Sequence, residues 1–162
     1  FLMEGLKNNF ELHWDGNCDP EFMKTKYDPR LVVIDDQSLE TDETRADNRR
    51  KLITDHTSNM VDFIEGDFMS PDIMSQVKDT HSEFDMCWFD CGGPIELQFF
   101  LDNYLDIVKE YFVVHFTFFK GKENKNGETI SKFLETKSHI QRLDIIEPHK
   151  YRQGSITILR KT

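Results

Sequence analysis

The sequence predicts an α/β fold in which helices cover both faces of a mostly parallel sheet, a three-layer arrangement. Short apolar runs alternate with helical patterns along the chain, which is typical of open sheets with crossover connections. Several of these runs are apolar on both alternating faces, as expected for parallel strands that are buried on both sides. With 162 residues, the chain suits a single domain over residues 1–162. Since the first residue is Phe1, we expect the N-terminus of that domain to be incomplete.

The apolar runs have the length of β-strands. The last two runs are joined by the segment PHKYRQG, which is too short for a crossover helix. We therefore expect these two strands to form an antiparallel hairpin at one edge of the sheet. The predicted strands comprise residues 10–14, 30–35, 61–67, 84–90, 111–119, 142–147 and 155–161.

Helical patterns separate the predicted strands and begin with recognisable start signals. Thr41 is a plausible N-cap, and Pro71 and Pro94 stand where a first helical residue is expected. Proline suits that place because its φ is already helical and its missing N–H would have no partner there. The predicted helices comprise residues 19–27, 41–57, 70–78, 94–110 and 127–137.

Charge and cysteine content narrow the class of protein. The net charge of −10 argues against a general nucleic-acid binder, because phosphate contacts rely on Lys and Arg. The densest basic run, residues 45–53, is interrupted by Asp47 and is interpreted as a solvated helix face. No apolar stretch reaches the roughly 18 residues of a membrane span, so we expect no membrane association. The odd set Cys18, Cys87 and Cys91 lacks C-x-x-C spacing, which predicts reduced thiols in a cytoplasmic protein and no zinc site.

Acidic residues close most of the predicted parallel strands. Ligands of open α/β sheets bind outside the carboxyl ends of the strands, where these acids are expected. Any single Asp there has a simpler explanation, because Asp commonly caps the helix that follows a strand. As a set they favour a nucleoside-shaped slot. Asp35, which ends the second predicted strand, could accept from both ribose hydroxyls, and Asp67, after the third, from an adenine amino group.

The strand pattern, the terminal hairpin and the acids at these strand ends resemble the class I S-adenosylmethionine-dependent methyltransferases, over residues 8 to 161. The resemblance implies a Rossmann-like methyltransferase fold and S-adenosylmethionine as the cofactor. It implies that Asp35, with its neighbour Asp36, holds the ribose and that Asp67 holds the adenine amino group. Phe68 would offer its backbone N–H and its ring to the adenine.

The same resemblance assigns the loop after the fourth predicted strand. Asp90 and Cys91 would lie there beside the methionine part of the cofactor and the substrate. Some O-methyltransferases of this family use a divalent ion held by acids after the fourth and fifth strands. Here the fifth strand ends in HFTFF, which contains no carboxylate, so we expect no magnesium site.

The first motif departs from the family pattern. The family has an acid and then a glycine-rich turn at the first strand, where this chain reads FELHWDGNCDP. Glu11 can stand for the acid, but Gly16 is the one glycine that remains, and His13 and Trp14 occupy places where small residues are expected. Three interpretations stay open. Cofactor binding is retained, or the domain is a non-catalytic one used for binding or assembly, or the true first strand lies upstream of Phe1.

His115 is the candidate general base on this rim. An imidazole can take a proton from an attacking hydroxyl near neutral pH. The alternative is a core histidine that is hydrogen-bonded to neighbouring backbone.

These observations predict an enzyme that transfers a methyl group from S-adenosylmethionine to a small molecule, with an oxygen as the acceptor. A small-molecule substrate is the expected partner. Edge strands and 14 phenylalanines leave a homodimer open. A nucleotide-dependent oxidoreductase on a related sheet is disfavoured, because the chain contains no G-x-G-x-x-G and the final hairpin fits methyltransferases better.

Overall fold

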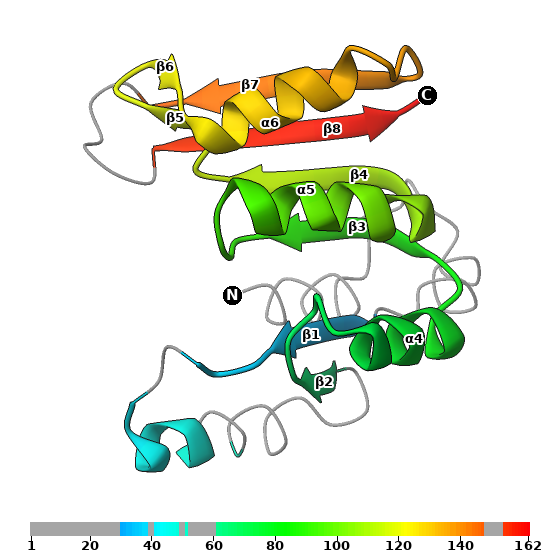
Figure 1. Ribbon diagram of the computed structural model, residues 1–162, viewed down its shortest axis with the longest axis vertical. Coiled ribbons are helices and arrows are strands. Elements are labelled where there is room, and N and C mark those ends of the chain that lie inside the picture. The colour runs from blue at the N-terminus through cyan, green and yellow to red at the C-terminus, as the bar shows by residue number, and fades with distance from the viewer. Residues whose placement is uncertain (1–29, 39–40, 49–50, 52–60, 148–153) are drawn as a thin grey trace, which may run out of the picture. The chain divides into compact units, whose positions relative to one another are not determined.

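The computed structural model describes residues 30–38, 41–48, 51, 61–147 and 154–162 (Figure 1). The chain divides into two compact units, Phe1–Ile73 and Met74–Thr162, which are described one at a time. The strand predicted at residues 10–14 and the helix predicted at 19–27 lie outside the described residues. That the whole chain forms a single domain stays a prediction.

The first unit contains a parallel pair of strands. Strands β1 (Leu31–Asp35) and β2 (Val61–Glu65) pair over their whole length, from Leu31 opposite Val61 to Asp35 opposite Glu65. Both were predicted from their apolar runs. Residues 43–48 and 51 are helical, inside the helix predicted at 41–57. Helix α4 (Pro71–Thr80) follows β2, begins at the expected proline and continues into the second unit.

The second unit contains a four-stranded sheet with the order β3-β4-β8-β7. Strand β3 (Phe84–Phe89) lies parallel to β4 (Val108–His115), while β8 (Ser155–Lys161) lies antiparallel to both β4 and β7 (Ile140–Ile146). The predicted terminal hairpin is therefore confirmed, with β7 at the edge. The last strand is inserted between its hairpin partner and β4, as Figure 1 shows.

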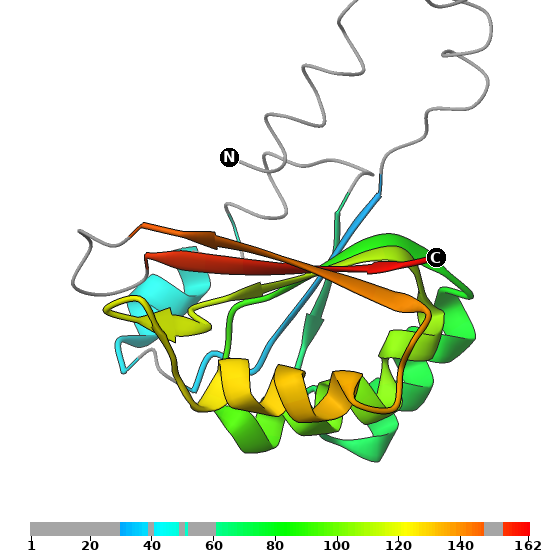
Figure 2. The same cartoon turned by 90° about the horizontal axis from the view of Figure 1, so that it is seen from above.

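Helices α5 (Pro94–Asn103) and α6 (Lys125–Leu134) lie on one face of this sheet (Figure 2). Phe100 of α5 stacks on Phe112 of β4, with ring centroids 5.1 Å apart, and meets Phe89 of β3 edge-on at 5.3 Å. Offset and edge-on aromatic pairs add to the free energy gained by burial. These rings fix which residues of β3 and β4 face the helices, and so which residues face the other way.

Two predicted boundaries were wrong. The helix predicted at 94–110 ends at Asn103, and a short 3-10 turn, η2 (Leu105–Ile107), leads into β4. Tyr104, 2% exposed, stacks on Phe100 at 4.7 Å, and Val108, also 2% exposed, pairs with β3, so burial rather than helical periodicity decides this segment.

The strand predicted at 111–119 also stops early. Phe116 has a φ of 58°, a left-handed conformation that ends β4 at His115. The next aromatic residues form β5 (Phe118–Phe119), which pairs with β6 (Lys122–Glu123) in a separate two-stranded ribbon.

Arg142 of β7 ties the hairpin to α6 and to this ribbon. Its guanidinium donates to Asp144 at 3.0 Å, to Ser131 of α6 at 2.6 Å and to Glu123 of β6 at 2.6 Å. Thr157 of β8 donates to the same Asp144 oxygen at 2.6 Å. Because the Arg142 side chain is only 16% exposed, these charge-assisted bonds are less screened by water than surface pairs.

The turn between β3 and α5 depends on Gly92. Its φ is +64°, and a Cβ there would come within 2.6 Å of the Glu96 side chain. Glu96 in turn accepts a hydrogen bond at 2.8 Å from the N–H of Gly93, the N-cap of α5. The N–H groups of Glu96 itself and of Gly93 hold the pKa of this carboxyl below its usual value.

Replacing Gly92 by alanine should destabilise the protein by about 2 kcal/mol, from the left-handed backbone and the displaced Glu96 side chain. Urea unfolding followed by circular dichroism measures the loss. Gly93→Ala is the matched control, because its φ is −121° and the nearest atom to a new Cβ is 3.5 Å away. Equal losses in the two variants would contradict this account of the turn.

Candidate functional site

The predicted ribose-binding acids lie at the carboxyl end of β1. Asp35 is exposed, and its Oδ1 accepts from the N–H of Gln37 at 2.7 Å. Asp36 is exposed as well, and its Oδ1 accepts from the N–H of Ser38 at 2.9 Å. Bonds from the backbone and side chain of Ser38 lower the pKa of Asp36, so this carboxylate is ionised at neutral pH.

The predicted adenine-binding acid lies at the same end of the neighbouring strand. Asp67 is exposed, and its Oδ1 accepts from the N–H of Met69 at 2.9 Å, while Phe68 is half-buried. The N–H of Gly66 donates to the carbonyl of Asp35 at 3.2 Å, so the loops that follow β1 and β2 adjoin.

The structure therefore brings these acids of the first unit to one edge of the β1–β2 pair. Each carboxylate makes a turn with its own loop through one oxygen, which is the simpler role that the sequence allowed. Within the described part of the chain, Oδ2 of Asp35 and Oδ2 of Asp67 have no hydrogen-bond partner. Both are oriented acceptors that a hydroxyl or amino group could reach.

In the second unit, the neighbouring strands β3 and β4 bring Asp90 and His115 together. Asp90 directly follows β3 and His115 is the last residue of β4. Oδ1 of Asp90 lies 2.6 Å from Nδ1 of His115. An ionised carboxylate can only accept, so the ring proton of a neutral His115 is on Nδ1 and the lone pair on Nε2. The imidazole is 16% exposed and the carboxylate 55%, so the pair lies at the surface edge of the sheet.

Trp88 lies beside this pair. The sequence analysis did not include Trp88 among the candidate site residues. Its indole centroid is 6.3 Å from that of the His115 imidazole, and the residue is 42% exposed. The alternation within residues 84–90 indicated it, because the side chains of Trp88 and Asp90 are two residues apart and so point to the same face of the sheet. The contact between Trp88 and His115 could not be predicted from the sequence, because it depends on the register between β3 and β4.

The two cysteines near Asp90 differ in character. Burial, with a further contribution from Cys91, raises the pKa of the Cys87 thiol to about 12, so Cys87 stays protonated and unreactive at neutral pH. Cys91, predicted to lie beside the cofactor, is exposed directly after Asp90. The predicted Glu11 and Gly16 lie outside the described residues.

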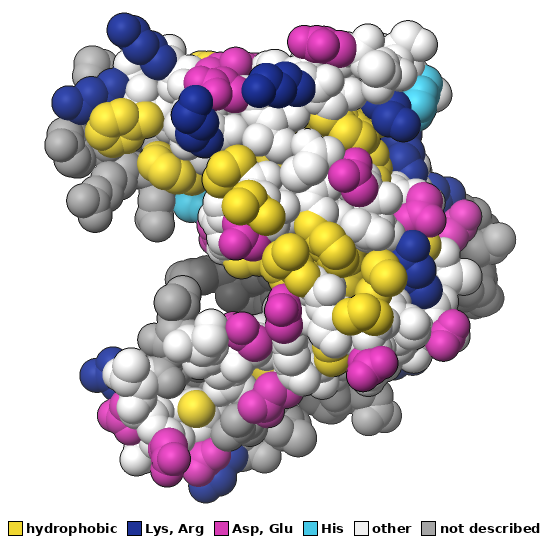
Figure 3. Space-filling view, viewed as in Figure 1, with side chains coloured by type: hydrophobic (Ala, Val, Ile, Leu, Met, Phe, Trp, Pro, Cys, Tyr) yellow, Lys and Arg dark blue, Asp and Glu magenta, His cyan; other side chains and the backbone are white. Residues whose placement is uncertain are grey.

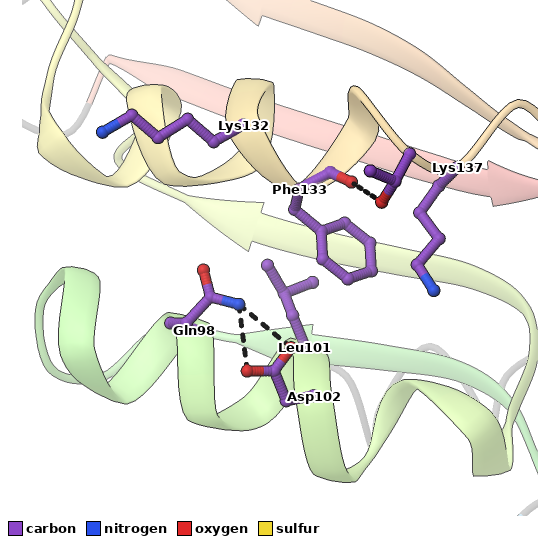
Figure 4. A pocket seen from close by; sticks show the side chains of 7 residues that line it. Gln98, Leu101, Asp102, Lys132, Phe133 and Lys137 are labelled. Atoms are coloured by element: carbon purple, nitrogen blue, oxygen red, sulfur yellow. Dashed lines mark hydrogen bonds between the residues drawn. The ribbon is translucent and has the colours of Figure 1, made fainter.

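Other features of the described residues do not add to the site. No group of three or more His, Cys, Asp or Glu side chains among them is arranged to hold a metal ion. No helix among them is long and apolar enough to cross a membrane. A cavity of about 410 Å³ lies between α5 and α6, on the helix-covered side of the sheet (Figure 4). None of the predicted site residues lines it; the lining residues are Gln98, Leu101, Asp102, Lys132, Phe133, Thr136 and Lys137.

No protein-family model matches the chain, and no curated protein matches its sequence. Solved structures do match. An O-methyltransferase from Bacillus cereus, in complex with S-adenosylhomocysteine, is 16% identical with a TM-score of 0.56, over 82% of this chain and 63% of that one. TomG, an O-methyltransferase from Streptomyces achromogenes involved in tomaymycin synthesis and solved with S-adenosylmethionine, is 17% identical with a TM-score of 0.58, over 82% and 62%.

An rRNA methylase from Streptococcus thermophilus has the same fold at 9% identity and a TM-score of 0.54, over 83% of this chain and 87% of that one. This chain thus spans less than two thirds of the two O-methyltransferases and most of the rRNA methylase. At these identities the likeness establishes the fold. The predicted Rossmann-like methyltransferase fold, with its C-terminal antiparallel hairpin, is confirmed.

Removing the Asp90 carboxylate should change the tautomer of His115. In Asp90→Ala the acceptor at Nδ1 is gone, so the ring proton is expected to redistribute toward Nε2. The ¹⁵N chemical shifts of the His115 imidazole at neutral pH report this directly. Lys109 makes a long ion pair with Asp85 at 3.9 Å on the same two strands, so Asp85→Ala is the control and should leave the His115 signals unchanged. An unaltered tautomer in Asp90→Ala would contradict the assignment.

Proposed function

We propose that this protein is an S-adenosylmethionine-dependent methyltransferase that acts on an oxygen of a small molecule. The observation that carries the proposal is the 2.6 Å contact between Asp90 and His115 at the ends of adjacent parallel strands. The likeness in fold to two O-methyltransferases solved with S-adenosylmethionine or its product supports it. The cofactor would supply an activated methyl group, and the chain's own residues would bind it and prepare the acceptor.

The first unit offers acceptors that fit the nucleoside part of this cofactor. Asp35 presents a free carboxylate oxygen of the kind that binds ribose hydroxyls, and Asp36 adds negative charge beside it. Asp67 presents a second free oxygen that an adenine amino group could donate to. The turns formed by these acids hold the carboxylates in place before any ligand arrives, which reduces the entropy lost on binding.

The Asp90–His115 pair offers a general base for the acceptor. With Nδ1–H bonded to Asp90, Nε2 of His115 can accept a proton from a hydroxyl. Asp90 acts through His115 as a positioning residue, because it fixes the tautomer and stabilises the imidazolium once the proton has moved. General-base assistance of this kind contributes about 10²–10⁴-fold in rate.

A small-molecule acceptor agrees better with the charge of the chain than a nucleic acid does. The net charge is −10, and the view in Figure 3 has Lys and Arg side chains interspersed with Asp and Glu rather than joined in one basic surface. A cytoplasmic location and a homodimer stay predictions. The non-catalytic alternative, which the unusual first motif keeps open, is decided by the first experiment below.

Calorimetric titration with S-adenosylhomocysteine tests cofactor binding. The wild-type chain should bind, and Asp35→Ala and Asp67→Ala should each weaken binding by about 10- to 100-fold, through loss of a charge-assisted hydrogen bond. Asp62→Ala, an exposed aspartate within β2, is the matched control and should bind like wild type. A folded wild-type chain that gives no heat would overturn the enzyme proposal in favour of the non-catalytic one.

Replacing His115 by asparagine should lower kcat for methyl transfer by about 10²–10⁴-fold, because the proton acceptor is lost. The affinity for S-adenosylhomocysteine should change by less than about twofold, since His115 is assigned to the acceptor and not to the cofactor. His139→Asn changes an exposed histidine of the same unit and serves as the control. A fully active His115→Asn variant would remove the base from the mechanism.

A further inference from the structure

We propose that the cavity between α5 and α6 is an accessory binding site for a small carboxylic acid with an aromatic body. This site is separate from the one assigned to methyl transfer, because none of the predicted cofactor or acceptor residues lines the cavity. Three features of the cavity carry the inference, namely its apolar floor, the two lysines at its rim and the positions of the two helices that enclose it.

The floor of the cavity is apolar. Leu101 of α5 is 3% exposed, and Phe133 of α6 is half-buried. Figure 4 shows the Phe133 ring between the two helices, beside Leu101. The volume of about 410 Å³ falls within the range of about 300–1,000 Å³ that is common for small-molecule sites. An aromatic group placed against Leu101 and Phe133 would gain free energy, because it removes apolar surface from water.

Two lysines that line the cavity supply positive charge. Within the described part of the chain, the ammonium groups of Lys132 and Lys137 make no hydrogen bond or salt bridge. Nζ of Lys137 is 5.5 Å from the centroid of the Phe133 ring, a cation–π contact that holds the charge close to the apolar floor. Glu128 lies one turn before Lys132 on α6, but its carboxylate is paired with Lys125 at 2.8 Å.

The carboxylate that lines the cavity has its own partner. Both oxygens of Asp102 accept from the side-chain amide of Gln98, each at 3.0 Å. The charged groups of the lining are thus two ammoniums and one carboxylate, a positive balance in a chain whose net charge is −10. Since the surrounding charge of the chain is negative, this local excess of positive charge favours an anion in the cavity.

An aromatic carboxylate matches both parts of the cavity. Its ring would cover the floor, and its carboxylate would accept a charge-assisted hydrogen bond from Lys137. An uncharged aromatic molecule would leave the ammonium without this partner. An anion without an apolar body would leave Leu101 and Phe133 as exposed as they are in the empty cavity.

The helices that enclose the cavity follow the two strands of the proposed site. Gly93, the N-cap of α5, belongs to the turn after Asp90. Asn124, the N-cap of α6, donates from its side chain to the carbonyl of Phe116 at 2.8 Å, and Phe116 directly follows His115. A ligand that contacts both helices stabilises the folded second unit by mass action, so the melting temperature should rise with its concentration.

Calorimetric titration of the full chain with three probes tests the inference. The probes are 2-naphthoate, its uncharged amide 2-naphthamide, and acetate, which carries the charge without the ring. We expect 2-naphthoate to bind about tenfold more tightly than either of the others, and its affinity to fall as the salt concentration is raised. Equal binding of the amide, or displacement of 2-naphthoate by S-adenosylhomocysteine, would overturn the inference.

Variants of the lining residues locate the binding. Lys137→Gln should weaken 2-naphthoate binding by about fivefold or more, through loss of the charge-assisted hydrogen bond. Asp102→Asn should strengthen it by about twofold, because a like charge is removed. Lys122→Gln is the matched control, since it removes one exposed positive charge of β6 that does not line the cavity, and it should bind like wild type.

The second role open to Lys137 gives a different result. A lysine just after a helix offsets the partial negative charge of the helix C-terminus, and α6 ends at Leu134. With that role alone, Lys137→Gln would lower the melting temperature and leave the affinity for 2-naphthoate unchanged, which would overturn the inference. None of these measurements uses a methyl donor, so their outcome is independent of the proposed function.

Discussion

Strand β4 is the element on which the second unit depends. It pairs in parallel with β3 and antiparallel with β8, so its backbone is hydrogen-bonded on both edges. Phe112 and Val114, 1% and 0% exposed, face α5, where Phe112 stacks on Phe100. This double attachment leaves His115, the last residue of the strand, little freedom to move. The proposed role of His115 as a general base requires such a fixed position, because proton transfer requires hydrogen-bond reach.

The end of β4 is held as firmly as its middle. Phe116 leaves the strand with a φ of 58°, a conformation that costs a residue with a Cβ about 1–2 kcal/mol. Hydrogen bonds hold this conformation. The N–H of Phe116 donates to the carbonyl of Ser155 at 2.9 Å, and its carbonyl accepts from the side chain of Asn124 at 2.8 Å. Asn124 is also the N-cap of α6, so one residue ends the strand and starts the helix.

The polar cluster around Arg142 joins the β7–β8 hairpin to the rest of the second unit. Asp144 accepts from Arg142 and from Thr157, and Thr157 is hydrogen-bonded to Thr117 at 2.7 Å. These bonds lie on the helix-facing side of the hairpin, while Ile145 alternates to the opposite side. These hydrogen bonds help to fix the register of β7 against β8, in which Ile145 lies opposite Ile156, and Ile156 in turn lies opposite His115.

Within the described residues, the sequence by itself determined where the strands of the two main sheets and the helices begin, because strand length, two-sided apolar character and helix start signals are local properties. It also placed Asp35, Asp67 and Asp90 at strand ends and required a hairpin from the short segment before Gly154. Tertiary structure alone decided the rest. The insertion of β8 beside β4, the early end of β4 and the meeting of Asp90, His115 and Trp88 all depend on register between strands. Register is set by packing between residues far apart in the chain, so it cannot be predicted from a local sequence pattern.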